Sequence, residues 1–280
     1  MKRQKATKII ASILATVLAA STLTACGGGS EYNGYASAYN KVTANGGMEA
    51  KFDVDLTMDG EKVESEGDFK LDTSGDANIL YYEMTTGEND IIQFSDGEYI
   101  YTDMGDSKSM YKLGTKPSGG DSGKEETKGS TEGFSTNAFL NEFSSFLEAG
   151  KIKELGLLSP IEKAAISSIK KEGDTYVLTF SDALVKKYLN TLVQNETGKD
   201  ADETIQIDEL NDFTYKATEK DGMLTGVQYT GVLKVNVPGS LLDGEDKTYD
   251  LDMDINITFV NPGEKVSIEL PSTDGFTEVK

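Results

Sequence analysis

The feature of this 280-residue chain that most constrains its fold is a strict alternation of apolar and polar side chains. From position 48 to position 59 every even residue is apolar and every odd residue is polar, and a second run of the same kind covers 249–259. Period two is the pattern of a β-strand with one buried face and one face in water. Shorter runs recur around Phe69, Tyr176 and Val235, so we expect a chain built mainly of strands.

Short turn sequences separate the alternating runs, as at Asp96-Gly97 and Asp221-Gly222. Tight turns that contain glycine join neighbouring antiparallel strands. The runs predict about ten strands, and a sheet of that size usually curves strongly. The sequence therefore favours one large, curved antiparallel sheet.

Three segments have the apolar spacing of helices: 136–150, 181–195 and, more weakly, 36–44. A helix with one apolar stripe packs well onto the inside of a curved sheet. The expected fold class is therefore α+β, a half-barrel of antiparallel strands that wraps two or three helices.

The segment 114–133 is rich in Gly, Ser, Lys and Glu and has almost nothing to bury, which predicts a mobile loop or a domain boundary. We favour one domain over 36–275 with a loop at 114–133, because the strands before the segment have few helices of their own to cover them. The sequence leaves the boundary open as the alternative.

The N-terminus has the three zones of a secretory signal. The first eight residues carry four positive charges and no negative ones, 9–20 are almost wholly apolar, and Leu23-Thr24-Ala25 precedes Cys26, the only cysteine. The apolar zone is too short for a resident transmembrane helix. We expect a signal peptide over 1–25 and a flexible tether over 26–35.

The run Leu23-Thr24-Ala25-Cys26 resembles the lipobox of bacterial lipoproteins. The resemblance implies that the thiol of Cys26 carries a diacylglycerol group, with fatty acids such as palmitate. Two acyl chains hold a protein firmly at a membrane surface. We therefore expect a lipid-anchored protein on the extracytoplasmic face of the cell membrane of a Gram-positive bacterium. The alternative is an ordinary cleaved signal followed by a chance cysteine.

Residue types that are missing exclude much chemistry. With one cysteine and no histidine, the chain has no internal disulfide and no Ser-His-Asp or Cys-His catalysis. The usual zinc and copper sites lack their preferred ligands. Without residues 1–25, 23 Lys and Arg face 48 Asp and Glu, a net charge of −25, so we expect no nucleic-acid partner. We expect no enzyme, no catalytic residues, no cofactor and no metal.

Acidic residues at Asp53, Asp55 and Glu64, and again at Asp250 to Asp254, have a spacing similar to that of a calcium loop. The glycine that an EF-hand needs at its sixth position is missing in both sets. Both sets lie within strand alternation. We therefore interpret them as acids on the wet face of the sheet.

The order of signal, tether, short helix, strands, loop, helix, hairpin, helix and strands resembles the LolA-like and LppX/LprG-like lipoprotein families over 36–270. In these families a half-barrel wraps helices and holds acyl chains. The resemblance is one of architecture, so it transfers no binding residues. It implies that an apolar cavity accepts a lipid or another hydrophobic ligand.

A cavity of this kind would be lined from two sides, by the helix stripes and by the strands opposite. The candidate lining is Phe139, Phe143, Phe146, Tyr188 and Leu192, with Phe52, Val54 and Met253 facing them. The alternative is that the same residues fill a closed core. In that case the surface or the 114–133 loop serves as an adaptor or modulator of envelope proteins.

Overall fold

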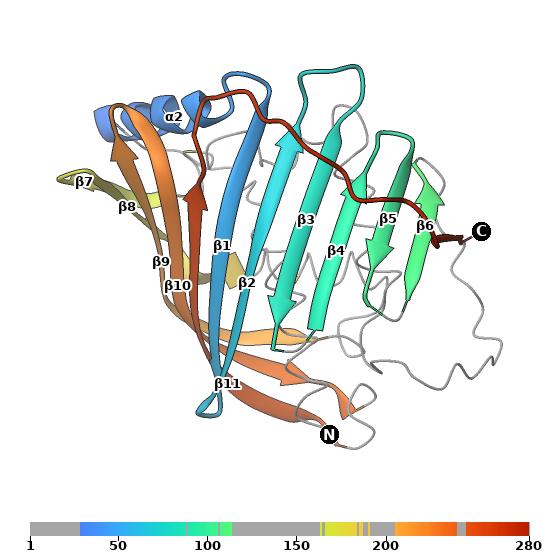
Figure 1. Cartoon of the computed structure of the whole chain (residues 1–280). Helices are drawn as coiled ribbons and strands as arrows, with labels where there is room; N and C mark the ends of the chain where they lie inside the picture. Colours follow the sequence, from blue (N-terminus) through green and yellow to red (C-terminus); the bar gives the residue numbers. More distant parts are fainter. Residues whose placement is uncertain are drawn as a thin grey trace.

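One sheet of 12 strands dominates the computed structural model, which describes residues 29–87, 89–105, 107–113, 163, 166–183, 185–186, 190, 205–239 and 245–279. The elements, labelled as in Figure 1, are α2 (Ser30–Val42), β1 (Gly47–Met58), β2 (Glu61–Asp72), β3 (Ile79–Thr86), β4 (Asn89–Ser95), β5 (Tyr99–Asp103), β6 (Lys108–Lys112), β7 (Ile166–Glu172), β8 (Thr175–Phe180), β9 (Gln206–Lys220), β10 (Met223–Val237), β11 (Lys247–Phe259) and β12 (Thr277–Glu278). The strand order is β12-β6-β5-β4-β3-β2-β1-β11-β10-β9-β8-β7, so the sheet is open. All neighbours are antiparallel except β12 and β6.

The two strictly alternating runs lie side by side at the middle of this sheet. Val54 of β1 pairs with Ile255 of β11, and Leu56 pairs with Met253. Their apolar residues are buried and share one face, which we call the inner face, whereas most of the interleaved polar residues are at least partly exposed on the outer face. The predicted antiparallel sheet is confirmed, and strands from both sides of the 114–133 segment belong to it.

Irregular pairing between β9 and β10 accompanies the curvature of the sheet. In their register Asp212 and Phe213 of β9 face Gly231 of β10 alone, and Asp212 has a φ of 54°. Such a β-bulge bends a strand and increases its twist. In Figure 1 the lower ends of β9, β10 and β11 turn sharply and pass beneath β2 and β3, so the inner face is concave.

Helix α2 packs on the inner face against β10 and β7. It begins at Ser30, which corrects the predicted tether over 26–35 and the predicted helix over 36–44. The reason is aromatic packing. Tyr35 is fully buried, its hydroxyl lies 3.2 Å from the hydroxyl of Tyr215, and its ring meets the ring of Tyr176 edge-on at 5.9 Å.

The other expected helices lie wholly or largely outside the described residues. This applies to 136–150 as a whole and to most of 181–195. Within the latter, Val185 is helical and buried, and Asn190 forms two hydrogen bonds with the backbone of Ile207 in β9, at 2.7 and 3.0 Å. The wrapping of two or three helices therefore stays a prediction, with α2 the one helix element among the described residues.

The segment after β11 crosses the outer face of the sheet and ends beside β6 (Figure 1). There β12 pairs in parallel with β6. The Phe276 ring stands edge-on to the rings of Phe94 and Tyr101, with centroids 5.8 and 5.3 Å away. This segment, which we call the C-terminal strap, covers outer-face aromatic residues of β4 and β5.

Gly34 of α2 lies directly against β8, which provides a test of how the helix is held. A Cβ at this position would lie 2.7 Å from the Tyr176 hydroxyl. That hydroxyl donates to Glu219 at 2.6 Å and accepts from Lys171 at 3.2 Å, so it is not free to move. We expect Gly34→Ala to lower the free energy of unfolding by about 1–2 kcal/mol in urea titrations.

The matched background for this variant is Tyr176→Phe. Without the hydroxyl, the nearest Tyr176 atom to the added Cβ lies at 3.5 Å, an ordinary contact. Gly34→Ala should then be neutral or stabilising, because alanine is favoured over glycine inside helices by about 1 kcal/mol. An equal cost in both backgrounds would contradict the packing described here.

Candidate functional site

Apolar side chains of the inner face gather where the bent strands pass beneath the flat part of the sheet. All but two come from β1, β3 and β9 to β11; Ile205 directly precedes β9, Val185 is helical, and α2 contributes none. We call this group the inner cluster: Phe52, Val54, Leu56, Met58, Met84, Val185, Ile205, Ile207, Leu210, Phe213, Leu233, Val235, Val237, Tyr249, Leu251, Met253 and Ile255.

The inner cluster contains every predicted lining residue that the structure describes. Phe52 and Val54 come from β1 and Met253 from β11, and alternation brings all three to the same face. The other five, Phe139, Phe143, Phe146, Tyr188 and Leu192, lie outside the described residues. The lining of a ligand site therefore stays a prediction, and its three described members lie in the inner cluster.

A glycine shapes the surface around Phe52. The Phe52 ring lies across Gly67 of β2 and stacks on Tyr82 of β3, with centroids 5.5 Å apart and planes 7° from parallel. The Tyr82 hydroxyl donates to the sulfur of Met84 at 3.1 Å, and burial raises the pKa of this phenol. Tyr82 thus stays neutral at physiological pH. The sequence analysis missed Gly67, because a glycine within a strand does not reveal which ring lies over it.

Methionines give the inner cluster an adaptable surface. Met58, Met84 and Met253 are all buried within it. Methionine is unbranched and polarizable, so it repacks around differently shaped partners more easily than leucine or isoleucine does. The arrangement suits contact with flexible hydrocarbon.

Polar groups also lie buried on the inner face, at the edge of the inner cluster. Gln93 of β4 has no exposed surface and Thr102 of β5 has 2%, and the Gln93 amide nitrogen donates to the Thr102 hydroxyl at 3.0 Å. Ser65 of β2 is hydrogen-bonded to Thr86 of β3 at 2.7 Å. The sequence analysis did not single out any of these residues.

A second group of buried hydroxyls lies beneath α2. Tyr35, Tyr215 and Tyr229 pack together, with the Tyr215 and Tyr229 rings 4.9 Å apart. Burial, followed by the neighbouring phenols, raises the pKa of Tyr215 well above its ordinary value. Burial likewise raises the pKa of Tyr229, so the Tyr215 and Tyr229 hydroxyls stay protonated at neutral pH. The group anchors the helix and offers no base for acid–base chemistry.

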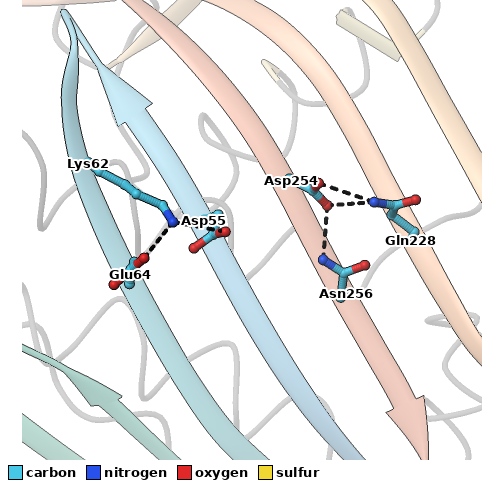
Figure 2. A network of polar contacts seen from close by, with 6 residues as sticks. All are labelled: Asp55, Lys62, Glu64, Gln228, Asp254 and Asn256. Carbon is cyan, nitrogen blue, oxygen red and sulfur yellow. Dashed lines mark hydrogen bonds and ion pairs between the residues drawn. The ribbon is translucent and has the colours of Figure 1, made fainter.

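Carboxylates dominate the middle of the outer face. Asp55 of β1 lies opposite Asp254 of β11 on one side and opposite Glu64 of β2 on the other. Figure 2 shows Lys62 between Asp55, at 3.3 Å, and Glu64. Hydrogen bonds to Glu64 and Asp55 raise the pKa of the Lys62 ammonium. The lysine relieves the repulsion in this row of acids.

The carboxylate of Asp254 accepts hydrogen bonds from two neighbouring amide groups. Gln228 donates to both of its carboxylate oxygens, at 2.9 and 3.1 Å, and Asn256 donates to one of them at 3.0 Å (Figure 2). The acids with calcium-like spacing thus lie on the outer face with solvent or polar partners.

Within the described ranges, no three Asp, Glu, His or Cys side chains come together as a set that would hold a metal ion. Nor does this part of the chain contain a helix with the length and apolar character needed to cross a membrane.

Comparisons with known proteins give distant matches. No protein-family model matches the chain, and no curated protein matches it. Among solved structures, the chain is similar to a DUF1329 family protein from Desulfovibrio piger, at 7% identity and a TM-score of 0.28, with 85% of this chain and 95% of that chain covered. It is also similar to a LolA superfamily protein from Nitrosomonas europaea, at 7% identity and a TM-score of 0.26, with 87% and 96% covered. At TM-scores this low, function has to be argued from the geometry of the chain itself.

The contact between Gly67 and Phe52 is testable. A Cβ at position 67 would collide with the Glu83 carbonyl oxygen and with the Phe52 ring. We expect Gly67→Ala to lower the free energy of unfolding by about 2–3 kcal/mol in urea titrations, because the backbone oxygen has no room to yield. Gly75→Ala is the control, since its Cβ meets nothing closer than 3.7 Å. It should stay within about 0.5 kcal/mol of the parent. A tolerated alanine at 67 would contradict the stacked arrangement.

Proposed function

We propose that this protein binds a lipid or another hydrophobic ligand against the inner face of its sheet, at the inner cluster. The observation that carries the proposal is the extent of that surface. Apolar side chains continue from β3 across β1 and β11 to β10 and β9, with the helical residue Val185 packed among them, whereas α2 packs on a different group around Tyr35. A concave apolar face of this kind is a common setting for small-molecule sites.

The chemistry of the inner cluster supports an acyl chain as the bound group. Its methionines adapt to a flexible partner, and its aromatic rings give broad apolar contact. Phenols such as Tyr82 stay neutral because burial raises their pKa. Hydrocarbon bound here would be withdrawn from water, and each buried CH₂ is worth about 0.8 kcal/mol.

We further propose that the chain acts as a lipoprotein at the extracytoplasmic face of the membrane, anchored through Cys26. The support is the N-terminal sequence, which lies outside the described residues. The first described helix begins at Ser30, four positions after the cysteine. The folded body would therefore be held close to the membrane surface, where a lipid ligand is available.

Organic extraction of the purified protein, followed by mass spectrometry, tests the binding function. We expect lipid to co-purify with the protein, in addition to any lipid bonded to Cys26. The Cys26→Ser variant separates the two, because it has no anchor and any lipid in its extract is bound non-covalently. Extracts without lipid, together with a tightly packed core, would favour the adaptor or modulator function instead.

A single-tryptophan reporter locates the ligand, because the chain has no tryptophan of its own. Phe180→Trp places the indole on the inner face, beside Phe213 of the inner cluster. Val232→Trp places it on the outer face, where Val232 is 40% exposed. Octadecane brominated at mid-chain, delivered from cyclodextrin, should quench the first reporter and spare the second. Equal quenching of both would contradict an inner-face site.

The anchor is tested by metabolic labelling with palmitate in a Gram-positive host. Cys26→Ser should abolish the label and move the protein from the membrane fraction to the medium, because the thiol that accepts the lipid is gone. Ser30→Ala is the control and should keep both label and location. A membrane-bound, labelled Cys26→Ser variant would refute the assignment.

A further inference from the structure

The side-chain amide of Gln93 is only partly hydrogen-bonded among the described residues. The residue is fully buried, and its amide nitrogen donates to the Thr102 hydroxyl at 3.0 Å. Among the described residues, its side-chain oxygen is the buried side-chain atom that lacks a hydrogen-bond partner. Leaving a buried carbonyl oxygen unpaired is costly, so a native fold rarely does so without a reason.

The surroundings of Gln93 connect it to the proposed ligand site. Across the sheet it pairs with Tyr82 of β3 on one side and with Thr102 of β5 on the other. Tyr82 packs against the inner cluster and stacks on Phe52. Ile91, two residues before Gln93 on the same strand face, also packs against the inner cluster. The unpaired oxygen thus lies between the inner cluster and a smaller buried apolar cluster on the same face, formed by Leu71, Leu80, Ile100 and Tyr111.

The inner face is neutral in this region. In the register of β3 to β6, the described side chains that share a face with Gln93 are apolar or hydroxyl-bearing and carry no charge: Leu80, Tyr82, Met84, Thr86, Ile91, Ser95, Ile100, Thr102, Ser109 and Tyr111. An ionised head group would lose its hydration here without gaining a counter-charge. A neutral group that donates a hydrogen bond would pair with the Gln93 oxygen without this cost of desolvating a charge.

We propose that Gln93 is the head-group recognition residue of the ligand site, and that the ligand is a neutral amphiphile with a long apolar chain and a hydroxyl or amide donor. The inference rests on the proposed function and adds the chemical class of the ligand. The chain lies along the inner cluster, and the donor hydrogen-bonds to the side-chain oxygen of Gln93. Fatty alcohols, monoacylglycerols and diacylglycerols combine a long chain with a neutral hydroxyl donor. Ionised fatty acids are charged, and dialkyl ethers have no donor.

Two probes that differ in a single donor test the inference. Diphenylhexatriene, a hydrocarbon without hydrogen-bonding groups, reports occupation of the apolar site by its fluorescence. Octadecanol and octadecyl methyl ether then compete with it for the lipid-free protein. We expect octadecanol to displace the dye at about tenfold lower concentration, since the ether leaves the buried oxygen unpaired. Stearate at neutral pH should compete less well than octadecanol.

Gln93→Met should remove the preference and bring the two competitors to within about twofold. Because this change leaves Thr102 without its partner, Gln93→Met combined with Thr102→Val serves as a second variant, which replaces both polar groups by apolar ones of similar shape. Ser65→Ala is the matched control. It removes a paired inner-face hydroxyl, which lies 2.7 Å from that of Thr86, and should keep the preference.

The outcomes separate this inference from the proposed function. Failure of the parent protein to bind diphenylhexatriene or to release it to either competitor overturns the hydrophobic site and the head-group inference together. Equal competition by alcohol and ether in the parent overturns the role of Gln93 and leaves the hydrophobic site standing. A preference that persists in both Gln93 variants overturns that role as well.

Discussion

The ladder between β1 and β11 holds the two parts of the sheet together, because it joins β1 to β6 to the strands β7 to β11. Apolar pairs such as Val54 with Ile255 fix its register on the inner face. A shift of this register by one residue would expose these side chains to water and bring aspartates to the inner face. The same register sets Asp55 opposite Asp254 on the outer face, so burial on one side prevails over like-charge repulsion on the other.

Prediction from the sequence succeeded where one face of a strand is buried and the other is wet. β1 and β11 meet this condition, so alternation alone assigned Phe52, Val54 and Met253 to a common face. It holds in the second half of β9, where Phe213, Tyr215 and Ala217 are buried, and fails in the first half, where the buried residues Ile207, Leu210 and Phe213 are three apart. Bulges shift the phase there, and the pairing with β10 that produces them is a property of the assembled sheet. The early start of α2 was missed for a similar reason, since Tyr35 gains its partners only in the fold.

Gln93 illustrates the other limit of sequence analysis. Three successive residues at the end of β4, from Gln93 to Ser95, are buried, so this part of the strand has no wet face and no alternation. Phe94 is buried on the outer side because the C-terminal strap places Phe276 against it. A glutamine in such a strand gives no sign of the face on which it lies. Only the register with β3 and β5 places it on the inner face, between two apolar clusters.

The C-terminal strap also affects the order in which parts of the fold can form. β4, β5 and β6 are adjacent in the chain and form local hairpins, which assemble early in folding. Phe276, which covers Phe94 and Tyr101, follows only after β11 has been synthesised. Until Phe276 is in place, the outer face of β4 and β5 lacks this aromatic cover. A chain that ends before Phe276 would therefore expose the rings of Phe94 and Tyr101 on the outer face.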